Sequence, residues 1–307
     1  MNSQMILANG TLPKSERQVR DGGRRSEERC IISIDTDILE NDGSITANGG
    51  DASQSSQAGG GSGGSVYIIA SSVFSGTGTV SAHGGRGDGA GGCGAGGRVA
   101  IHLKSQYAYR GTLEALGGIS SSSGASGGPG TVYIKDVRYK LYFEQLHVDN
   151  QGQSWQNYVT LNESKTSYHF HELHLVHKAS LRMTPSSNLT QSSTLSIGKL
   201  FGDRSGLLHL YNGHKAIIEV VEAQLTTTKT PVNLRIDSGA EAVMATTVYI
   251  VGDGAVALHC NGTLNGVRNL YVTQKRVVLL EQGSRTLRDD EQPGTFMFSN
   301  EIGRAHV

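Results

Sequence analysis

The segment Gly63-Gly64-Ser65-Val66-Tyr67-Ile68 recurs twice along the chain. Its copies are Gly96-Gly97-Arg98-Val99-Ala100-Ile101 and Gly128-Pro129-Gly130-Thr131-Val132-Tyr133-Ile134, so the shared valines are spaced 33 residues apart. β-branched and aromatic residues at alternate positions, bounded by Gly, are typical of a half-buried β-strand. The repeated segment therefore predicts one strand for each 33-residue unit.

A second mark, a short strand followed by Ala-x-Gly-Gly, lies in register with the first. It reads Ser44-Ile45-Thr46-Ala47-Asn48-Gly49-Gly50, then Thr79-Val80-Ser81-Ala82-His83-Gly84-Gly85, then Thr112-Leu113-Glu114-Ala115-Leu116-Gly117-Gly118. The two marks recur together at intervals of 33 or 35 residues, which indicates stacked supersecondary units. We expect an all-β, parallel β-helix-like solenoid in which Val66, Val99 and Val132 form a buried column.

Long Gly/Ser-rich loops separate the marks, for example residues 83–98 and 117–130. They contain little that can be buried, and Gly loses the most backbone entropy on ordering. We predict flexible excursions on the solenoid surface. The alternative is that Gly-rich strands pack side by side in polyproline II geometry, where only Gly permits close approach.

Composition excludes several classes of protein. The 27 Lys and Arg residues balance 27 Asp and Glu residues, so the formal net charge is zero. A nucleic-acid-binding surface normally needs a basic excess, which is absent. No apolar run approaches the roughly 18–20 residues of a membrane span. We predict neither a nucleic-acid partner nor a membrane span in this segment.

The ends of the chain do not fit the repeat. Residues 1–30 carry mixed charges with almost no apolar content, so we expect a disordered or non-native lead. Residues 301–307 (Glu-Ile-Gly-Arg-Ala-His-Val) match the translation of a sequencing-adapter oligonucleotide, so we expect an assembly artefact and a natural protein that continues beyond it. Between them we expect a Gly-rich repeat solenoid over 31–140 and a continuation with ordinary Gly content over 141–300.

The second half keeps the strand pattern without the repeat. Asn-Gly pairs between its strands favour hairpins, so an antiparallel β-sandwich is the alternative there. The strands we expect are Phe143–Val148, Tyr168–Val176, Ser180–Met183, Thr194–Ile197, Leu207–Leu210, Ala216–Val221, Val232–Ile236, Thr246–Val251, Ala255–His259, Arg268–Val272 and Val277–Leu280.

His169 and His171 are the candidate metal ligands. Two residues apart on a strand, they share a face, as two zinc ligands would. Leu173 and Leu175 continue the same alternation and so lie on the same face of the strand. Such a site would therefore sit among core residues unless a bulge intervenes. No Cys or carboxylate at ligand spacing completes the set, so we favour a solvated polar stripe.

Arg86-Gly87-Asp88 lies inside the second Gly-rich loop. This tripeptide resembles the integrin-recognition motif, which presents a cation and a carboxylate from an exposed flexible loop. A Gly-rich segment containing a few charges also produces the tripeptide by chance, and the other two loops lack it.

Asp35 and Asp37 share a strand face, as carboxylates do in the groove of a lyase or hydrolase. No second acidic cluster or basic partner recurs at the 33-residue interval. We predict no catalytic residues and no cofactor, and we keep a carbohydrate-active β-helix enzyme as the rival class, because fold does not fix function.

Four Asn-x-Ser/Thr sequons begin at Asn9, Asn162, Asn188 and Asn261, the last three being our glycosylation candidates. Cys30, Cys93 and Cys260 are too few for a disulfide framework, and their number is odd.

The unit of Ala-x-Gly-Gly, Gly-rich loop and Gly-Gly-x-Val-x-Ile resembles the Gly-rich repeat segment of very large extracellular or cell-surface proteins of eukaryotes, some with ephrin-receptor-like, Cys-rich modules downstream. The resemblance covers residues 31–135 best. It implies a structural or adhesive segment, with cell-surface or matrix proteins or glycans as partners. An intracellular location is the alternative if Met1 is the natural start.

Overall fold

The computed structural model describes residues 4–7, 30–52, 58–104, 106–120, 124–138, 141–154, 157–161, 167–183, 193–203, 205–210 and 215–221, and short strands between 233 and 298. These residues contain strands and no helix. The chain divides into two compact units, Met1–Gln153 and Ser154–Val307, and each is described by itself.

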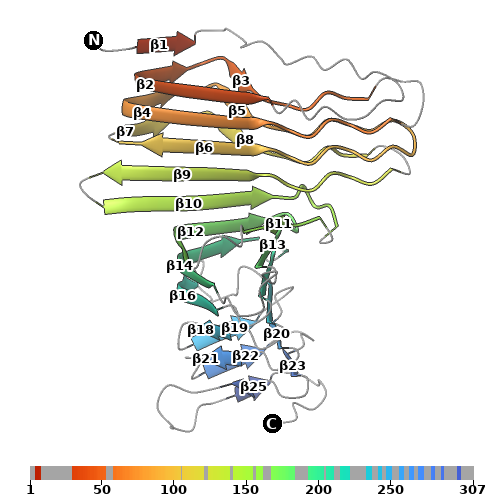
Figure 1. Cartoon of the computed structure of the whole chain (residues 1–307). Helices are drawn as coiled ribbons and strands as arrows, with labels where there is room; N and C mark the ends of the chain where they lie inside the picture. Colours follow the sequence, from red (N-terminus) through yellow and green to blue (C-terminus); the bar gives the residue numbers. More distant parts are fainter. Residues whose placement is uncertain are drawn as a thin grey trace. The chain divides into compact units, whose positions relative to one another are not determined.

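The described residues of the first unit form ten strands (Figure 1). They are β1 (Gln4–Leu7), β2 (Ile31–Asn41), β3 (Ser44–Thr46), β4 (Ser65–Gly76), β5 (Thr79–Ser81), β6 (Arg98–Leu103), β7 (Gln106–Tyr109), β8 (Thr112–Glu114), β9 (Thr131–Arg138) and β10 (Leu141–Asp149). We call residues 31–64, 65–97 and 98–130 repeats 1, 2 and 3.

Equivalent strands of successive repeats pair in parallel. In one sheet β2, β4, β6 and β9 are neighbours, and β7 also pairs with β4. In a second sheet β3, β5 and β8 are neighbours. Val66 pairs with Val99 and Val99 with Val132, at exposed fractions of 1%, 1% and 5%. The predicted buried column is confirmed.

The core lies between these two sheets. The alternate inward residues of β4 and β6 are fully buried, and Ile45 and Val80 of the short strands face them within the same cluster. Burial of Val and Ile stabilises the fold by about 1.5–3 kcal/mol for each side chain. Since β4 and β6 each bury one face, a single repeat has no complete core, and stacking supplies it.

Two features of this unit differ from expectation. Gln4–Leu7, within the segment predicted to be disordered, form β1 and pair in parallel with residues 38–41 of β2. β10 pairs antiparallel with β9, which reverses the strand direction and joins β10 to the first unit. The break between units therefore falls after Gln153, whereas the loss of Gly after residue 140 had suggested an earlier boundary.

The second unit is also built from parallel pairs. One sheet runs β12-β14-β16-β18-β21-β24, a second β11-β13-β15-β17-β20-β23, and a third β19-β22-β25. The bounds are β11 Val159–Thr160, β12 Ser167–Val176, β13 Ser180–Met183, β14 Thr194–Gly202, β15 Leu207–Leu210, β16 Lys215–Val221, β17 Asn233–Ile236, β18 Glu241–Val243, β19 Thr247–Ile250, β20 Val256–Leu258, β21 Thr263–Asn265, β22 Asn269–Val272, β23 Val278–Leu280, β24 Arg285–Thr286 and β25 Phe296–Phe298.

All eleven strands expected in the second half are present, two of them, β13 and β15, with the expected bounds. The pairs within Ser154–Val307 are parallel wherever the structure describes them, from β11·β13 to β22·β25. The antiparallel sandwich is therefore wrong for these strands. The Asn-Gly pairs at residues 212–213 and 261–262, which had favoured hairpins, lie outside the described residues.

Candidate functional site: the glycine lattice and its polar ladder

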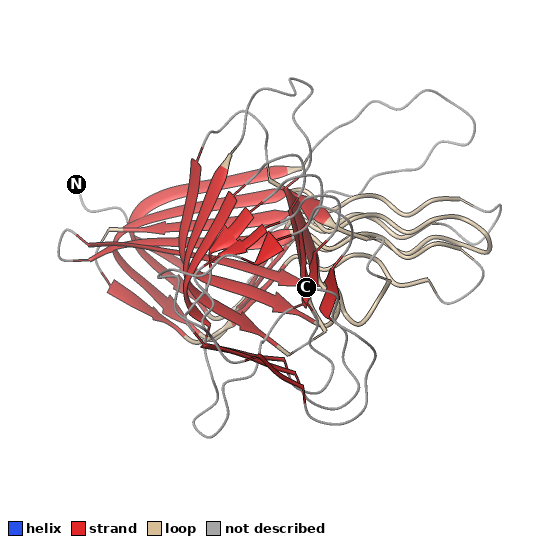
Figure 2. Ribbon diagram, turned by 90° about the horizontal axis from the view of Figure 1, so that it is seen from below, coloured by secondary structure: helices blue, strands red, loops and turns tan. Residues whose placement is uncertain are grey.

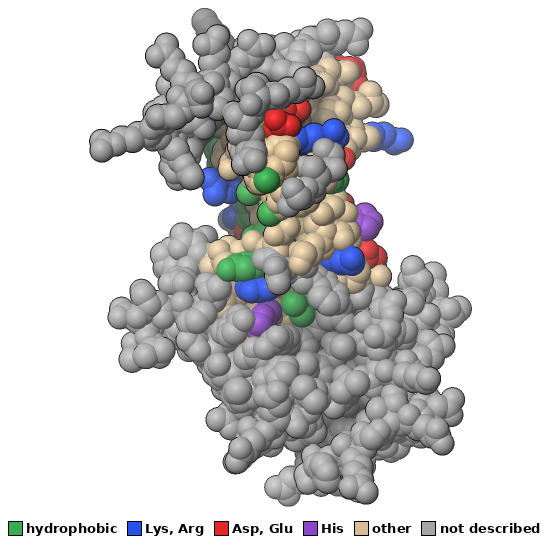
Figure 3. Space-filling view, turned by 90° about the vertical axis from the view of Figure 1, so that its right-hand side faces the viewer, with side chains coloured by type: hydrophobic (Ala, Val, Ile, Leu, Met, Phe, Trp, Pro, Cys, Tyr) green, Lys and Arg blue, Asp and Glu red, His purple; other side chains and the backbone are tan. Residues whose placement is uncertain are grey.

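The Gly-rich loops are extended and lie in register beside one another (Figure 2). Each leaves the end of a short strand as an outgoing segment, residues 47–52, 82–88 and 115–120. Each comes back as a returning segment, residues 58–64, 91–97 and 124–130. In the space-filling view the described part of this edge is mostly backbone and uncharged polar side chains, with scattered charged ones (Figure 3).

Hydrogen bonds join the loops in a three-residue rhythm. The N–H groups of Gly60 and Gly63 donate to carbonyl oxygens of repeat 2, and those of Gly61 and Gly64 donate to the outgoing segment of their own repeat. The same pattern recurs one repeat later at Cys93, Gly94, Gly96 and Gly97, and all eight bonds measure 2.7–2.9 Å. A polyproline II strand has three residues per turn, so every third N–H points the same way. The spacing of the bonds matches that of such strands, and the loops form a hydrogen-bonded lattice.

Close packing explains why these positions are Gly. A Cβ placed on Gly94 would lie within 3.0 Å of the Gly61 carbonyl oxygen, and a Cβ on Gly127 equally close to that of Gly94. By contrast, a Cβ on Gly92 would meet nothing nearer than 3.9 Å. The interpretation as flexible excursions is wrong for the described loop residues. The ordering entropy of Gly is offset by backbone hydrogen bonds that larger residues would prevent.

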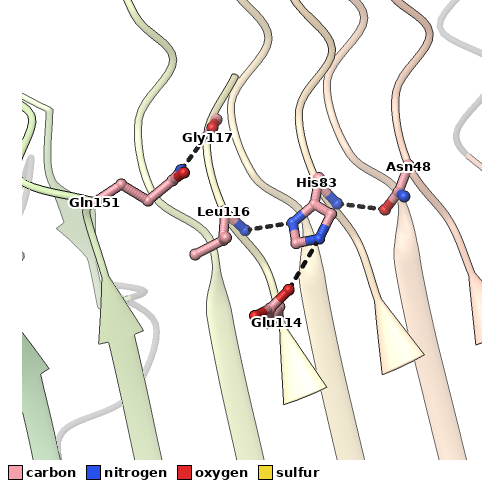
Figure 4. Close-up of polar contacts among 6 residues, drawn as sticks. All are labelled: Asn48, His83, Glu114, Leu116, Gly117 and Gln151. Atoms are coloured by element: carbon pink, nitrogen blue, oxygen red, sulfur yellow. Dashed lines mark hydrogen bonds and ion pairs between the residues drawn. The ribbon is translucent and has the colours of Figure 1, made fainter. Parts of the chain in front are cut away.

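A ladder of polar contacts crosses the base of the lattice, at position x of Ala-x-Gly-Gly (Figure 4). The Oδ1 atom of Asn48 accepts a 2.7 Å hydrogen bond from the backbone N–H of His83. In turn, Nδ1 of His83 accepts a 3.1 Å bond from the backbone N–H of Leu116. One side chain at each step therefore holds the backbone of the next repeat.

Two further contacts complete the ladder. Nε2 of His83 lies 3.3 Å from Oε2 of Glu114, and Nε2 of Gln151 donates to the Gly117 carbonyl oxygen at 2.8 Å. Burial lowers the pKa of His83, while Glu114 acts in the opposite direction. No motif in the sequence marks these residues as a site; the one signal for them is position x of the repeat, where equivalent side chains of successive repeats become neighbours.

A small pocket of about 130 Å³ lies beside the ladder. Strands β8, β9 and β10 line it, with Glu114, His147 and Asp149 as its titratable groups. Both carboxylates already have structural partners, because Glu114 pairs with His83 and Oδ1 of Asp149 accepts the N–H of Gln151 at 2.7 Å. The pocket is below the roughly 300 Å³ of sites that bind drug-sized molecules.

The Arg86-Gly87-Asp88 tripeptide lies in the outgoing segment of repeat 2, with its backbone held at each residue. Arg86 N–H donates to Oδ1 of Asp51 at 2.7 Å, Gly87 N–H to Sγ of Cys93 at 3.3 Å, and Asp88 N–H to the Ala58 carbonyl oxygen at 3.0 Å. The Arg86 side chain is exposed. The motif is thus presented from an ordered backbone, which differs from the flexible loop that the resemblance implies.

The histidines of β12 lie outside the core. His169 is exposed and His171 half-buried, their rings 4.6 Å apart, whereas Phe170, Leu173 and Leu175 are buried. The buried parity changes between Phe170 and Leu173, so the expectation that a site here would sit among core residues is wrong. In the part of the chain that is described, no three His, Cys, Asp or Glu side chains are grouped to hold a metal ion.

The remaining predicted residues that the structure describes form no common site. Asp35 is exposed and Asp37 half-buried, on either side of the buried Thr36. Cys30 and Cys93 are free thiols. Asn9, Asn162, Asn188, Asn261, Cys260 and residues 301–307 lie outside the described residues.

Comparison with protein-family models, with curated proteins and with solved structures finds no match for this chain. Among the described residues, no helix has the length and hydrophobicity that crossing a membrane requires.

Proposed function

We propose that this chain is a β-solenoid segment with a structural or adhesive role in a larger extracellular or cell-surface protein, and that it performs no catalysis. The observation that carries the proposal is the in-register stacking of repeats through both β-strands and Gly-rich strands. Three rows of hydrogen bonds, in two sheets and the lattice, link each repeat to the next. Bending the stack stretches these rows together, so the segment would act as a stiff spacer.

Amide hydrogen exchange tests the mechanical part of this proposal. We expect the amides of Gly94 and Gly97 to exchange as slowly as those of strands β4 and β6, because all are hydrogen-bonded within the stack. Exchange at these glycines within the dead time, as in a flexible linker, would contradict a stiff lattice. The full-length coding sequence tests the location: a secretory signal supports it, and a complete cytosolic reading frame opposes it.

The alternative function is that of a carbohydrate-active β-helix enzyme, a polysaccharide lyase or hydrolase. The pocket favours it to the extent that two carboxylates and a histidine line one cavity. Incubation with a panel of neutral and acidic polysaccharides, scored for new reducing ends and for unsaturated uronates, separates the two functions. Turnover that Glu114→Gln and Asp149→Asn abolish would overturn the structural role.

A further inference from the structure

A row of aromatic and polar side chains crosses the outward face of β4, β6, β9 and β10. The ring centroid of His102 lies 5.0 Å from that of Tyr67 and 5.8 Å from that of Tyr133, with interplanar angles of 74° and 66°. The row ends at Lys135, whose Nζ is 2.9 Å from Oε1 of Glu144. All five side chains are half-buried, so part of each ring or polar group faces solvent.

Contacts within the row hold these groups in place. The hydroxyl of Tyr67 lies 3.4 Å from Nδ1 of His102. Burial raises the pKa of Tyr133, and Glu144 adds to that rise, so its hydroxyl keeps its proton. Burial lowers the pKa of His102, with Lys135 acting in the same direction, which leaves the imidazole neutral near pH 7. The row therefore offers hydroxyl and imidazole groups in fixed positions.

Charge on this face argues against an anionic ligand. Lys135 and Glu144 neutralise one another. The exposed Asp35 on β2 extends the register row of Ile69, His102 and Lys135, and the exposed Arg98 on the same outward face of β6 balances its charge. A sulfated or uronic-acid polymer would find no excess of positive charge here, whereas an uncharged, hydroxyl-rich ligand needs none.

The spacing of the tyrosines defines the shape of the ligand. Tyr67 pairs in register with Ala100, and Ala100 with Tyr133, so the tyrosines occupy one position two strands apart with a small residue between them. Two strand spacings are about 10 Å. In an extended β-1,4-linked hexosan alternate rings present the same face, and two rings cover about that length. Aromatic rings pack against the apolar face of a sugar, and their polar edges bind its hydroxyls.

From this row we infer that the outward face of β4, β6 and β9 binds a neutral, extended β-1,4-linked glycan. The glycan runs across the strands, with alternate sugar rings against Tyr67 and Tyr133 and with hydroxyls hydrogen-bonded to His102, Lys135 and Glu144. This inference does not depend on the proposed scaffold role, because a flexible or catalytic protein could carry the same face.

Isothermal titration of the whole chain with cellohexaose and chitohexaose tests the inference, with maltohexaose, whose α-linked chain curves, as the control ligand. We expect a β-1,4-linked hexasaccharide to bind, and Tyr67→Ala and Tyr133→Ala each to weaken binding at least about tenfold. Tyr67→Phe keeps the ring and should bind within about twofold of the unaltered protein. Arg110→Ala, an exposed residue away from the row, should leave binding unchanged.

Hydroxyl-radical footprinting of the unaltered protein gives a second measurement that does not require the variants to fold. Cellohexaose or chitohexaose should protect Tyr67 and Tyr133 and leave the exposed Tyr158 reactive. The inference is overturned if neither β-1,4-linked hexasaccharide binds, if maltohexaose binds as tightly, or if bound glycan leaves both tyrosines unprotected.

Discussion

The backbone N–H of Leu116 donates a 3.1 Å hydrogen bond to Nδ1 of His83, which occupies the same place in the preceding repeat. A nitrogen that accepts a hydrogen bond has no proton of its own. The folded state therefore holds His83 neutral, with its Nε2–H directed toward Glu114. In the preceding repeat Oδ1 of Asn48 accepts the equivalent hydrogen bond, and this amide oxygen does not titrate.

Replacing this histidine should change how stability depends on pH. The pKa of His83 is lowered in the folded state from its ordinary value of 6.5. Just below pH 6.5 the unfolded chain binds a proton that the folded chain does not, so stability falls as the pH falls. His83→Asn keeps a hydrogen-bond acceptor, as Asn48 does in repeat 1. Near neutral pH its free energy of unfolding should lie within about 0.5 kcal/mol of that of the unaltered protein, and it should lose less stability on acidification.

Urea unfolding at about pH 7.5 and about pH 5.5 measures both effects. His83→Ala is the matched variant, since it removes the titrating group and also leaves the Leu116 N–H without its acceptor. It should lose about 1 kcal/mol at the higher pH. Equal pH dependence in the unaltered protein and in His83→Asn would show that His83 is not held neutral.

Two glycines of one loop should respond differently to a single methyl group. Gly94→Ala forces a Cβ against the backbone of Gly61, which cannot move without breaking the lattice, so we expect a loss of about 1–3 kcal/mol or more. Gly92→Ala has room and should be neutral or slightly stabilising. Thermal unfolding followed by circular dichroism compares them, and a similar melting temperature for both variants would argue against a close-packed lattice.

The buried column should be sensitive to volume. Ile101 is fully buried between Ile68 and Ile134 in register, so Ile101→Val should cost about 0.5–1.5 kcal/mol and Ile101→Ala about 2–5 kcal/mol. Arg98→Ala, on the same strand but exposed, should change stability by less than about 0.5 kcal/mol. Guanidinium unfolding gives all three values, and losing the graded order would mean that the strand does not face a packed core.

Tyr109 links three repeats through its hydroxyl. It donates to the Gly78 carbonyl oxygen at 2.6 Å and accepts from Nδ2 of Asn41 at 3.2 Å, while its ring stacks on Phe74 at 4.2 Å. Tyr109→Phe keeps the stack and removes both hydrogen bonds, so we expect a loss of about 1–3 kcal/mol near neutral pH.

Alkaline pH provides a second readout for the same residue. Burial raises the pKa of Tyr109 to about 12, so above pH 10 the unfolded chain loses its proton first and the folded state loses stability. Tyr109→Phe should reduce that loss, which urea unfolding at about pH 11 detects. Tyr107→Phe is the comparison: burial also raises the pKa of Tyr107, so this variant should reduce the alkaline loss as well, but by less than Tyr109→Phe. A larger effect from Tyr107→Phe would contradict the assignment.

The strands and their stacking could be predicted from sequence because both depend on local patterns. Alternating Val and Ile identify a strand and its buried face, and the 33-residue period fixes which residues become neighbours. The prediction was incomplete where the pattern is interrupted. In β12 the buried parity changes after Phe170, and no residue type marks that change, so spacing alone placed His169 and His171 on the same face as Leu173 and Leu175.

The polar ladder and the outward row of side chains could not be predicted from the sequence, and the reason is a different one. His83 contacts Leu116, and Tyr67 contacts His102, only because successive repeats lie side by side at a particular register. The two residues of each contact are more than thirty positions apart in the sequence. Whether they meet therefore depends on the length of the loop that connects their strands.

The sequence by itself determined an all-β chain with a buried valine column, because apolar side chains at every second position of a strand lie on one face and are buried together. Only the tertiary structure decided that the glycine loops are ordered, because one isolated Gly-rich strand gains nothing that offsets its entropy. Adjacent copies supply the hydrogen-bond acceptors, and the absence of side chains lets the backbones approach closely enough to use them.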